Sequence, residues 1–325
     1  MRSRLSPTRL NVAVTFTVIA AACLTGYASP ADTLQITADD AMITVHEADR
    51  RIACYRYDGT SFKPYIKELY TPAGINVLLD SPADHVHHHA LMFALEINGT
   101  DFWGETQTPA CGTQRHVALT KTRIGRGKDS RFARFAQTLG WLAPDDAGPL
   151  ITEERIICLD RLEGEEVTLL TWSTKLRPAP GRTTLKVDGR HYFGLGMRFV
   201  RPMDRTGTFS NADNLPGEVF RGDERLVRSR WCAYSAEIDG KPVTVAMFDA
   251  PANPRPAVFF TMKDPFAYLA ATLNLHEKSL TLNRGDSLDL AYGVAVWDGK
   301  VEAVRIETIY RKWLALLAGH AANAK

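Results

Sequence analysis

The chain has 325 residues, of which 45% are hydrophobic and 23% charged, and its formal net charge is +2. This composition is that of an ordinary folded protein and excludes a low-complexity or disordered chain. The near balance of charge gives no electrostatic reason to expect nucleic acid as a partner.

Residues 1–28 predict a secretory signal peptide. Three arginines form a basic start, residues 11–26 are mostly apolar, and cleavage after Ala28 fits a small-residue rule. An apolar run this short is typical of a signal peptide and not of a membrane-spanning helix. Its removal leaves 36 basic and 37 acidic residues. We expect an exported protein, periplasmic or extracellular, without a membrane span; a lipid anchor at Cys23 is a weaker alternative.

Four cysteines follow this leader, namely Cys54, Cys111, Cys158 and Cys232. Export permits disulfides, and three pairings are open. The wide spacings match no zinc pattern. Because a chain of this size can form a core without cross-links, buried free thiols are the favoured interpretation.

Alternating or β-branched runs dominate the rest of the chain and predict about fourteen strands. The runs are 41–47, 51–59, 91–99, 115–125, 131–142, 151–160, 166–176, 183–189, 191–200, 230–240, 241–250, 257–264, 279–286 and 288–299. Their connections are short and several contain Gly turns, which favours antiparallel pairing over alternating β-α units. We therefore predict an all-β fold, a large antiparallel β-sandwich, as a single domain over residues 32–320.

Two local elements are especially clear. Asp239-Gly240 separates two runs of suitable length, which predicts a two-residue hairpin. Residues 300–319 place apolar side chains at helical spacing, with Gly319 at the end, so they predict a C-terminal helix that packs on the sheet with Trp313 in the core.

The most distinctive stretch is "DHVHHH" at residues 84–89, which holds four of the nine histidines. If the backbone is extended over residues 84–93, the side chains of His85, His87 and His89 share one face and that of His88 points the other way. Three alternatives stay open. The first is ligation of a divalent metal through His85, His87 and His89, the second is acid–base chemistry or substrate binding, and the third is a solvated strand edge.

The metal alternative lacks a complete motif. The HExxH pattern of a helical zinc site is absent, and Glu96 lies too far along for a cupin-type site that begins with His-x-His. The acid–base alternative has carboxylates nearby in Asp84, Asp101 and Glu105. No cofactor is predicted firmly.

Several blocks of the chain together resemble the PmoA-like family, a group of mostly secreted bacterial proteins of unassigned function. The blocks are "DHVHHHALMFALEINGTDFWGE" (84–105), "HYFGLGMRF" (191–199), "RWCAYSAEIDGKPVTVAMFDAPANPRP" (230–256), "DPFAYLAATLN" (264–274) and "LDLAYGVAVWDG" (288–299). That family is similar to galactose-mutarotase-like supersandwich proteins. The resemblance implies a sugar ring bound on the concave face of a large sheet by His, Arg, carboxylate and Trp side chains. A methane-oxygenase label attached to the family finds no support in these residues.

Matching the motifs residue by residue gives the positions that the resemblance implies for the site. They are Asp84, His85, His87, His88, Asp101, Phe102, Trp103, Arg198, Trp231, Asp249, Asn253, Pro254 and Arg255. Three positions depart from the pattern, because Val86, His89 and Ala90 stand where the family has Pro, Arg and Gly.

The leading hypothesis is a secreted carbohydrate-active enzyme that hydrolyses, eliminates or epimerises a sugar or glycoside. His85, His87 or His88 would transfer the proton, and Arg198 would orient a substrate oxygen. The substrate-binding candidates are Asp101, Trp103, Glu105, Trp231, Asn253 and Arg255. The alternatives are a metal-dependent enzyme and a non-catalytic glycan-binding protein. A saccharide, as substrate or as ligand, is the expected partner.

Overall fold

A computed structural model describes residues 33–59, 62–106, 109–144 and 148–322. The predicted signal peptide and Cys23 lie outside these residues. Within them no helix has the run of apolar side chains that crossing a membrane requires. Cys54, Cys111, Cys158 and Cys232 are all buried and free.

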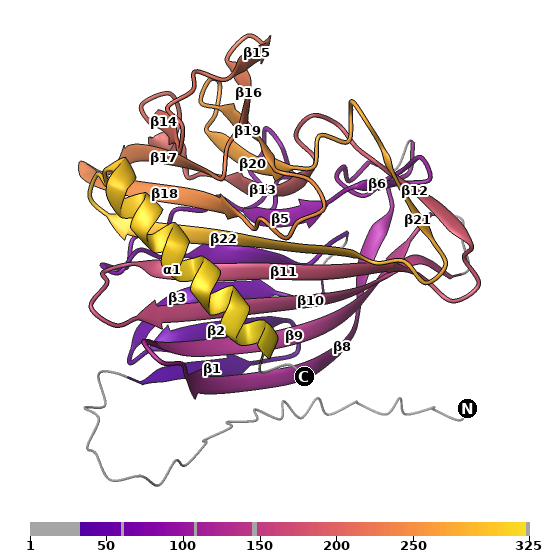
Figure 1. The fold of residues 1–325 in the computed structure, drawn as a ribbon, viewed down its shortest axis with the longest axis horizontal. Helices are drawn as coiled ribbons and strands as arrows, with labels where there is room; N and C mark the ends of the chain where they lie inside the picture. Colours follow the sequence, from indigo (N-terminus) through magenta and orange to yellow (C-terminus); the bar gives the residue numbers. More distant parts are fainter. Residues whose placement is uncertain (1–32, 60–61, 107–108, 145–147, 323–325) are drawn as a thin grey trace, which may run out of the picture.

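Two large antiparallel sheets pack face to face, and a small third sheet lies at one end (Figure 1). The ten-stranded sheet has the order β1 (Leu34–Ala38), β2 (Met42–Glu47), β3 (Arg50–Arg56), β4 (Tyr65–Leu69), β5 (Leu91–Ala94), β13 (Gly194–Arg198), β20 (Tyr268–Thr272), β19 (Val258–Met262), β16 (Glu224–Arg228) and β15 (Glu218–Arg221).

The second large sheet has eight strands, several of them much longer. Its order is β14 (Thr208–Asn211), β17 (Trp231–Ile238), β18 (Lys241–Asp249), β22 (Leu288–Asp298), β11 (Thr168–Pro178), β10 (Pro149–Leu162), β9 (Ser130–Leu142) and β8 (Thr113–Arg126). The small sheet has the order β21 (Leu280–Asn283), β12 (Thr184–Asp188), β6 (Glu96–Ile97) and β7 (Thr100–Asp101). The predicted all-β antiparallel sandwich is confirmed, although the runs divide into 22 strands over the described residues.

Apolar side chains fill the space between the two large sheets, as alternation along half-buried strands requires. The outer face of the eight-stranded sheet is covered by helix α1 (Ala303–Ala322), which runs diagonally across its long strands (Figure 1). The predicted helix and the buried position of Trp313 are confirmed. The predicted end at Gly319 is wrong, because the helix continues to Ala322.

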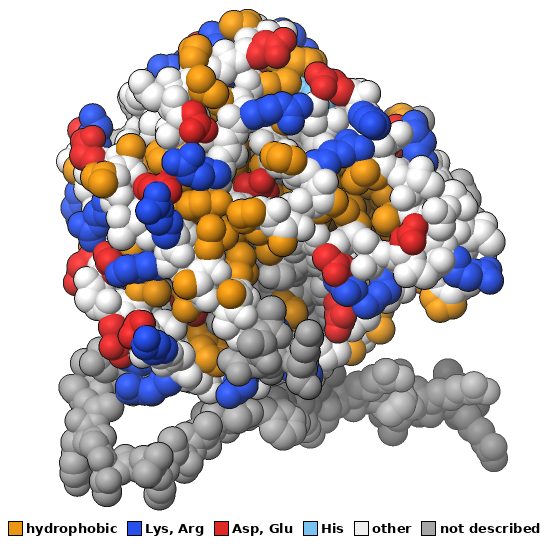
Figure 2. Space-filling view, in the orientation of Figure 1, with side chains coloured by type: hydrophobic (Ala, Val, Ile, Leu, Met, Phe, Trp, Pro, Cys, Tyr) orange, Lys and Arg blue, Asp and Glu red, His pale blue; other side chains and the backbone are white. Residues whose placement is uncertain are grey.

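On the face shown in Figure 2, Lys and Arg side chains alternate with Asp and Glu side chains, and apolar patches lie between them. This face therefore has no continuous basic field of the kind that binds nucleic acid.

The buried side chain of Arg155, which is paired with Glu153 on its own strand, connects the two large sheets. Arg155 of β10 donates from Nε to Glu153 Oε1 at 2.7 Å, and both side chains are fully buried. Its Nη1 donates to the Tyr55 hydroxyl of β3 and to the Pro64 carbonyl beside β4, at 3.3 and 3.0 Å. Its Nη2 reaches Gln114 Oε1 at 2.9 Å. The guanidinium therefore has acceptors on both sheets.

Arg155→Met is expected to lower the free energy of unfolding by about 3–5 kcal/mol, because it leaves the Glu153 carboxylate buried without its cation. The double variant Glu153→Leu/Arg155→Met removes both charges and should recover part of that loss. Urea unfolding followed by circular dichroism measures both. A single-variant loss below about 1 kcal/mol would contradict this role.

The Asp239-Gly240 hairpin is confirmed, since Ile238 pairs with Lys241 and both turn residues have positive φ, 51° and 75°. A Cβ on Gly240 would meet nothing within 4 Å. The change Gly240→Ala therefore tests backbone conformation alone, and we expect it to cost about 1 kcal/mol of stability. Gly319→Ala is the matched control, because Gly319 is helical and equally open. Gly319→Ala should raise the free energy of unfolding by up to about 1 kcal/mol. If urea unfolding shows that both substitutions change this free energy in the same direction, the interpretation is contradicted.

Candidate functional site

The site lies on the outer face of the ten-stranded sheet, around β5, β13 and β20. Phe93 of β5 contacts Trp141 of the opposite sheet, so its side of the strand faces the core. Met92, one residue earlier, pairs with Gly196, and Arg198 pairs with Tyr268. Strand alternation then places these residues on the outer face. By the same alternation, Met197, the neighbour of Arg198 on β13, faces the opposite side of the sheet.

Gly196 makes room for two large side chains on this face. A Cβ there would lie 2.2 Å from the Tyr268 hydroxyl and 2.7 Å from Trp103 Cη2. Trp103 stacks on Phe193 with ring centroids 5.1 Å apart and is only 2% exposed. The expected stacking of Trp103 on a sugar face therefore has no open ring surface in this conformation.

The histidine stretch is not extended, so that prediction is wrong. Residues 81–90 form successive turns, in which the His85 N–H donates to Pro82 O and the His88 N–H donates to His85 O, both at 2.9 Å. Ser81 and Ala90 bound these turns with φ of 45° and 46°. The left-handed conformation at residue 90 explains why the family pattern has Gly there.

The turns bring three imidazole rings together that an extended strand would separate. Ring centroids lie 5.7 Å apart for His85 and His87, 4.6 Å for His85 and His88, and 4.6 Å for His87 and His88. His89 is not part of this group. The alternative metal set of His85, His87 and His89 depended on one shared face, and the described residues contain no group of three side chains placed to hold a metal ion.

Arg198 places a buried cation beside these rings. Its Cζ lies 3.6 Å from the centroid of Phe266, and the side chain is 1% exposed. Its Nη2 donates to Asp84 Oδ2 at 3.2 Å. Asp84 also lies 3.0 Å from His85 Nδ1 and 3.3 Å from Arg201 Nη2, so three cationic or titratable groups share one carboxylate. Burial lowers the pKa of Arg198.

Buried polar atoms without a partner among the described residues concentrate at this place. They are His88 Nδ1, Trp103 Nε1, the Tyr268 hydroxyl, and Nε and Nη1 of Arg198. The Tyr268 ring lies 5.1 Å from that of His88 and 6.1 Å from that of Trp103. Each unsatisfied group costs about 1–3 kcal/mol. Such a concentration is what a binding site for polar atoms requires.

Burial keeps two of the clustered imidazoles, His87 and His88, neutral. Burial, followed by the neighbouring His87 and His85, lowers the pKa of His88 to about 2, so His88 is neutral at physiological pH. Burial and the Lys63 ammonium lower the pKa of His87. His87 has no hydrogen-bond partner among the described residues. It is thus a neutral ring that is able to accept a proton, whereas His88 can only serve as a neutral hydrogen-bonding group.

His89 belongs to a separate ionic network. Its Nδ1 lies 2.9 Å from Asp80 Oδ1 and its Nε2 lies 3.0 Å from Glu105 Oε1. Its ring stacks on Tyr65, whose hydroxyl donates to Asp80 Oδ2 at 2.9 Å. The buried Lys63 donates to Glu105 Oε1 at 2.5 Å. A protonated His89 between two carboxylates supplies a positively charged donor, as the Arg of the family pattern would at this position. Glu105, a predicted substrate-binding residue, is therefore paired with Lys63 and His89.

Four further predicted residues have structural partners away from the cluster or within a turn. Asp101 Oδ1 accepts the backbone N–H groups of Trp103 and Gly104 at 2.6 and 3.0 Å and so orients Trp103. Trp231 lies under helix α1 and donates to Glu307 at 2.9 Å.

Asn253 and Arg255, on either side of Pro254, stabilise loops. Asn253 donates to Asp249 Oδ1 at 2.7 Å and accepts from the Ala291 N–H at 2.8 Å. Arg255 donates to the carbonyls of Leu273, Lys278 and Ser279. The structure therefore does not bring Trp231, Asn253 or Arg255 to the histidines.

Sequence reasoning missed several residues of the site. Phe266 and Tyr268 lie in the quoted block 264–274, so a signal was present in the resemblance. Lys63, Tyr65 and Asp80 lie outside every quoted block, and only the folded chain shows that they surround His89.

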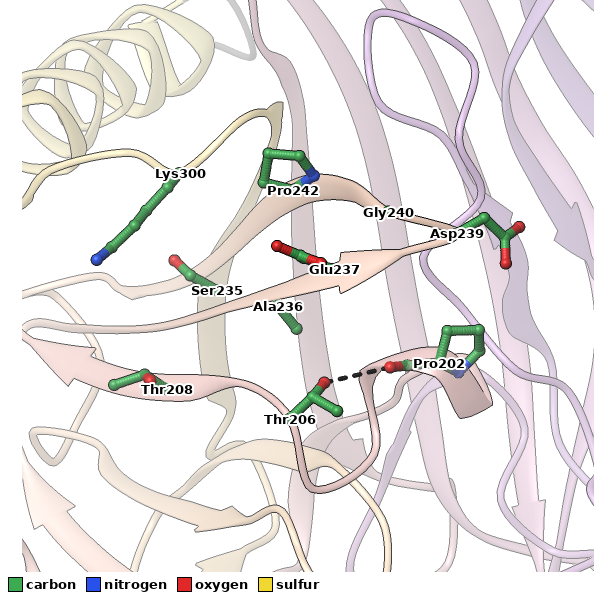
Figure 3. A pocket seen from close by; sticks show the side chains of 10 residues that line it. All are labelled: Pro202, Thr206, Thr208, Ser235, Ala236, Glu237, Asp239, Gly240, Pro242 and Lys300. Carbon is green, nitrogen blue, oxygen red and sulfur yellow. Dashed lines mark hydrogen bonds between the residues drawn. The ribbon is translucent and has the colours of Figure 1, made fainter.

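A separate hollow of about 510 Å³ lies between the β17–β18 hairpin, β14 and Lys300 (Figure 3). Glu237, Asp239 and three hydroxyl side chains line it, and Thr206 donates to the Pro202 carbonyl across one side. It contains none of the clustered histidines or Arg198. Its walls offer no imidazole for acid–base work.

A family model for a family of unknown function, DUF6807, matches residues 42–311. The chain belongs to this family. The PmoA-like assignment that the sequence suggested is not confirmed by this match. No curated protein matches the DUF6807 chain at a significant level.

Solved structures similar to this DUF6807 protein include sugar-acting enzymes. A GH36 α-galactosidase, AgaA from Geobacillus stearothermophilus, has a TM-score of 0.47 at 11% identity, over 82% of this chain and 41% of its own. A putative aldose 1-epimerase from Klebsiella pneumoniae has a TM-score of 0.44 at 10% identity, over 86% and 84%. A galactose mutarotase related enzyme from Lactobacillus acidophilus has a TM-score of 0.38 at 10% identity, over 83% and 100%. Matches at this level do not indicate an activity for this chain.

The His89 network predicts a pH-dependent stability. Burial is the largest single effect and lowers the pKa of His89, but the hydrogen bonds to Asp80 and Glu105 outweigh it, so the pKa is raised. The resulting stability is fully present below the unfolded pKa of about 6.5 and is lost as pH rises through the folded pKa. His89→Gln should therefore cost about 2 kcal/mol at pH 6, and clearly less at pH 9.

His89→Arg is the control, because it carries a permanent charge and should remove the pH dependence while keeping both ion pairs. Urea unfolding of the three proteins at several pH values measures this. A difference between the wild type and His89→Gln that grows with pH would contradict the assignment.

Proposed function

We propose that this protein is a secreted carbohydrate-active enzyme that uses histidine acid–base chemistry at the outer face of the ten-stranded sheet. One observation carries the proposal. Buried, unpartnered polar groups of His88, Arg198, Tyr268 and Trp103 surround one place beside the titratable rings of His85 and His87. A sugar offers many oxygen atoms on a small ring and can satisfy several such groups at once.

His87 is the proposed proton-transfer group. It is half-buried and neutral, and burial lowers its pKa, so it is able to accept a proton near neutral pH. His85 is the second proposed group. Its Nδ1 contacts the Asp84 carboxylate, which would hold the ring in one orientation and stabilise the imidazolium.

The neutral groups and the Arg198 cation are proposed to bind and orient the substrate. Tyr268 and Trp103 donate hydrogen bonds, His88 donates or accepts one, and Arg198 donates charge-assisted ones to a substrate oxygen. Hydrolysis, elimination and epimerisation all require proton transfer beside such a group of donors. The proposal therefore names the shared step and the residues that perform it.

Export to the periplasm or the extracellular space is part of the proposal. It is supported by the basic start and the short apolar run of residues 1–28.

The test is a panel of aldoses, methyl glycosides and disaccharides incubated with the purified protein. ¹H NMR reports anomeric exchange, bond cleavage and alkene formation in one measurement. His87→Gln is expected to lower kcat by about 10²–10⁴-fold while KM changes little. His46→Gln, on β2 of the same sheet, is the matched control and should leave both unchanged. Sugar binding without turnover would instead support a non-catalytic glycan-binding protein, and no binding at all would contradict the proposal.

A further inference from the structure

Hydrogen-bond donors outnumber acceptors among the unpartnered atoms around Arg198. Trp103 Nε1, Arg198 Nε and Arg198 Nη1 are donors only, and the Tyr268 hydroxyl and His88 Nδ1 are able to donate. No carboxylate oxygen is among the unsatisfied buried side-chain atoms of this neighbourhood in the described residues. The site therefore lacks acceptors, and its ligand must supply them.

The donors of Arg198 are poorly satisfied for a buried guanidinium. Its one hydrogen-bonded carboxylate is Asp84, which is 37% exposed and also contacts His85 and Arg201. Asp204 also attracts the Arg198 charge, but neither Nε nor Nη1 of Arg198 donates a hydrogen bond to it. Two of the three guanidinium nitrogens thus have no acceptor. In contrast, the buried Arg155 uses all three of its nitrogens.

We propose that the ligand is an acidic sugar, a uronic acid or uronoside, whose carboxylate binds the unpartnered side of Arg198. This inference rests on the proposed function, since it names the substrate class of the same site. A planar carboxylate supplies up to four acceptor positions in one group, so it can accept from both unpartnered nitrogens of Arg198. Charge-assisted hydrogen bonds to a guanidinium are about twice as strong as neutral ones. A neutral hydroxyl would satisfy one of these nitrogens and leave the other buried without an acceptor.

Matched sugar pairs test the inference without any variant. Isothermal titration calorimetry compares methyl galacturonide with methyl galactoside, methyl glucuronide with methyl glucoside, and each uronide with its neutral uronamide. The wild-type protein is expected to bind one uronide at least about tenfold more tightly than both neutral forms.

Variants then assign the preference to Arg198. Arg198→Gln should abolish the tenfold preference, and Arg198→Lys should retain part of it, because the ammonium keeps the charge but not the planar geometry. Arg201→Gln is the matched control at an exposed arginine that also contacts Asp84, and it should keep the preference. Circular dichroism establishes whether each variant is folded. If Arg198→Gln does not fold, the comparison of uronide with uronamide binding to the wild-type protein still tests the inference.

Three outcomes overturn the inference and are distinguishable. If neutral sugars bind as tightly as uronides, the carboxylate proposal is wrong and the proposed carbohydrate function stands. If no sugar of either kind binds, both proposals are wrong. A preference for uronides that Arg198→Gln leaves intact would also contradict the assignment to Arg198.

Discussion

The guanidinium of Arg155 makes hydrogen bonds to both large sheets. It is fully buried, so each of its donors needs an acceptor, and it finds them in Glu153 on one sheet and Tyr55 and Pro64 on the other. A change in sheet spacing or register would leave the buried Nη1 donor of Arg155 without its acceptors Tyr55 and Pro64, although Glu153 on the same strand would still pair with the charge. This requirement is specific in direction, whereas the apolar contacts of the core are not. It therefore fixes how the sheet that carries the site lies on its neighbour.

That constraint extends to the candidate site through neighbouring residues. The Pro64 carbonyl bound by Arg155 lies between Lys63, which holds Glu105, and Tyr65, which holds Asp80. Those two carboxylates hold His89, the last residue of the histidine stretch. The turns at residues 81–90 are thus attached to the core through a series of buried polar contacts. A site built in this way keeps its geometry although its backbone is a loop.

The two buried arginines show how the molecule treats structural and functional polarity differently. Arg155 has acceptors for all its nitrogens, which is the normal state of a buried charge. Arg198 has one, although it is just as buried and also stacks on Phe266. A buried arginine with two unpartnered nitrogens departs from that state, and such departures are expected at functional sites. The contrast between the two arginines therefore supports the candidate site without reference to any relative.

The sequence by itself determined the secondary structure and the fold class, because alternation, Asp-Gly turns and helical spacing act over a few residues. It also indicated His85, His87, His88 and Arg198 as neighbours in function. Only the tertiary structure decided that residues 81–90 turn, that His89 joins a different network, and that Asn253 and Arg255 hold loops. These outcomes depend on acceptors such as Asp80, Glu105 and Lys278, which lie 9, 16 and 23 residues along the chain from the side chains that they bind. No local pattern encodes which distant groups meet, because that is set by the register of paired strands and the packing of two sheets.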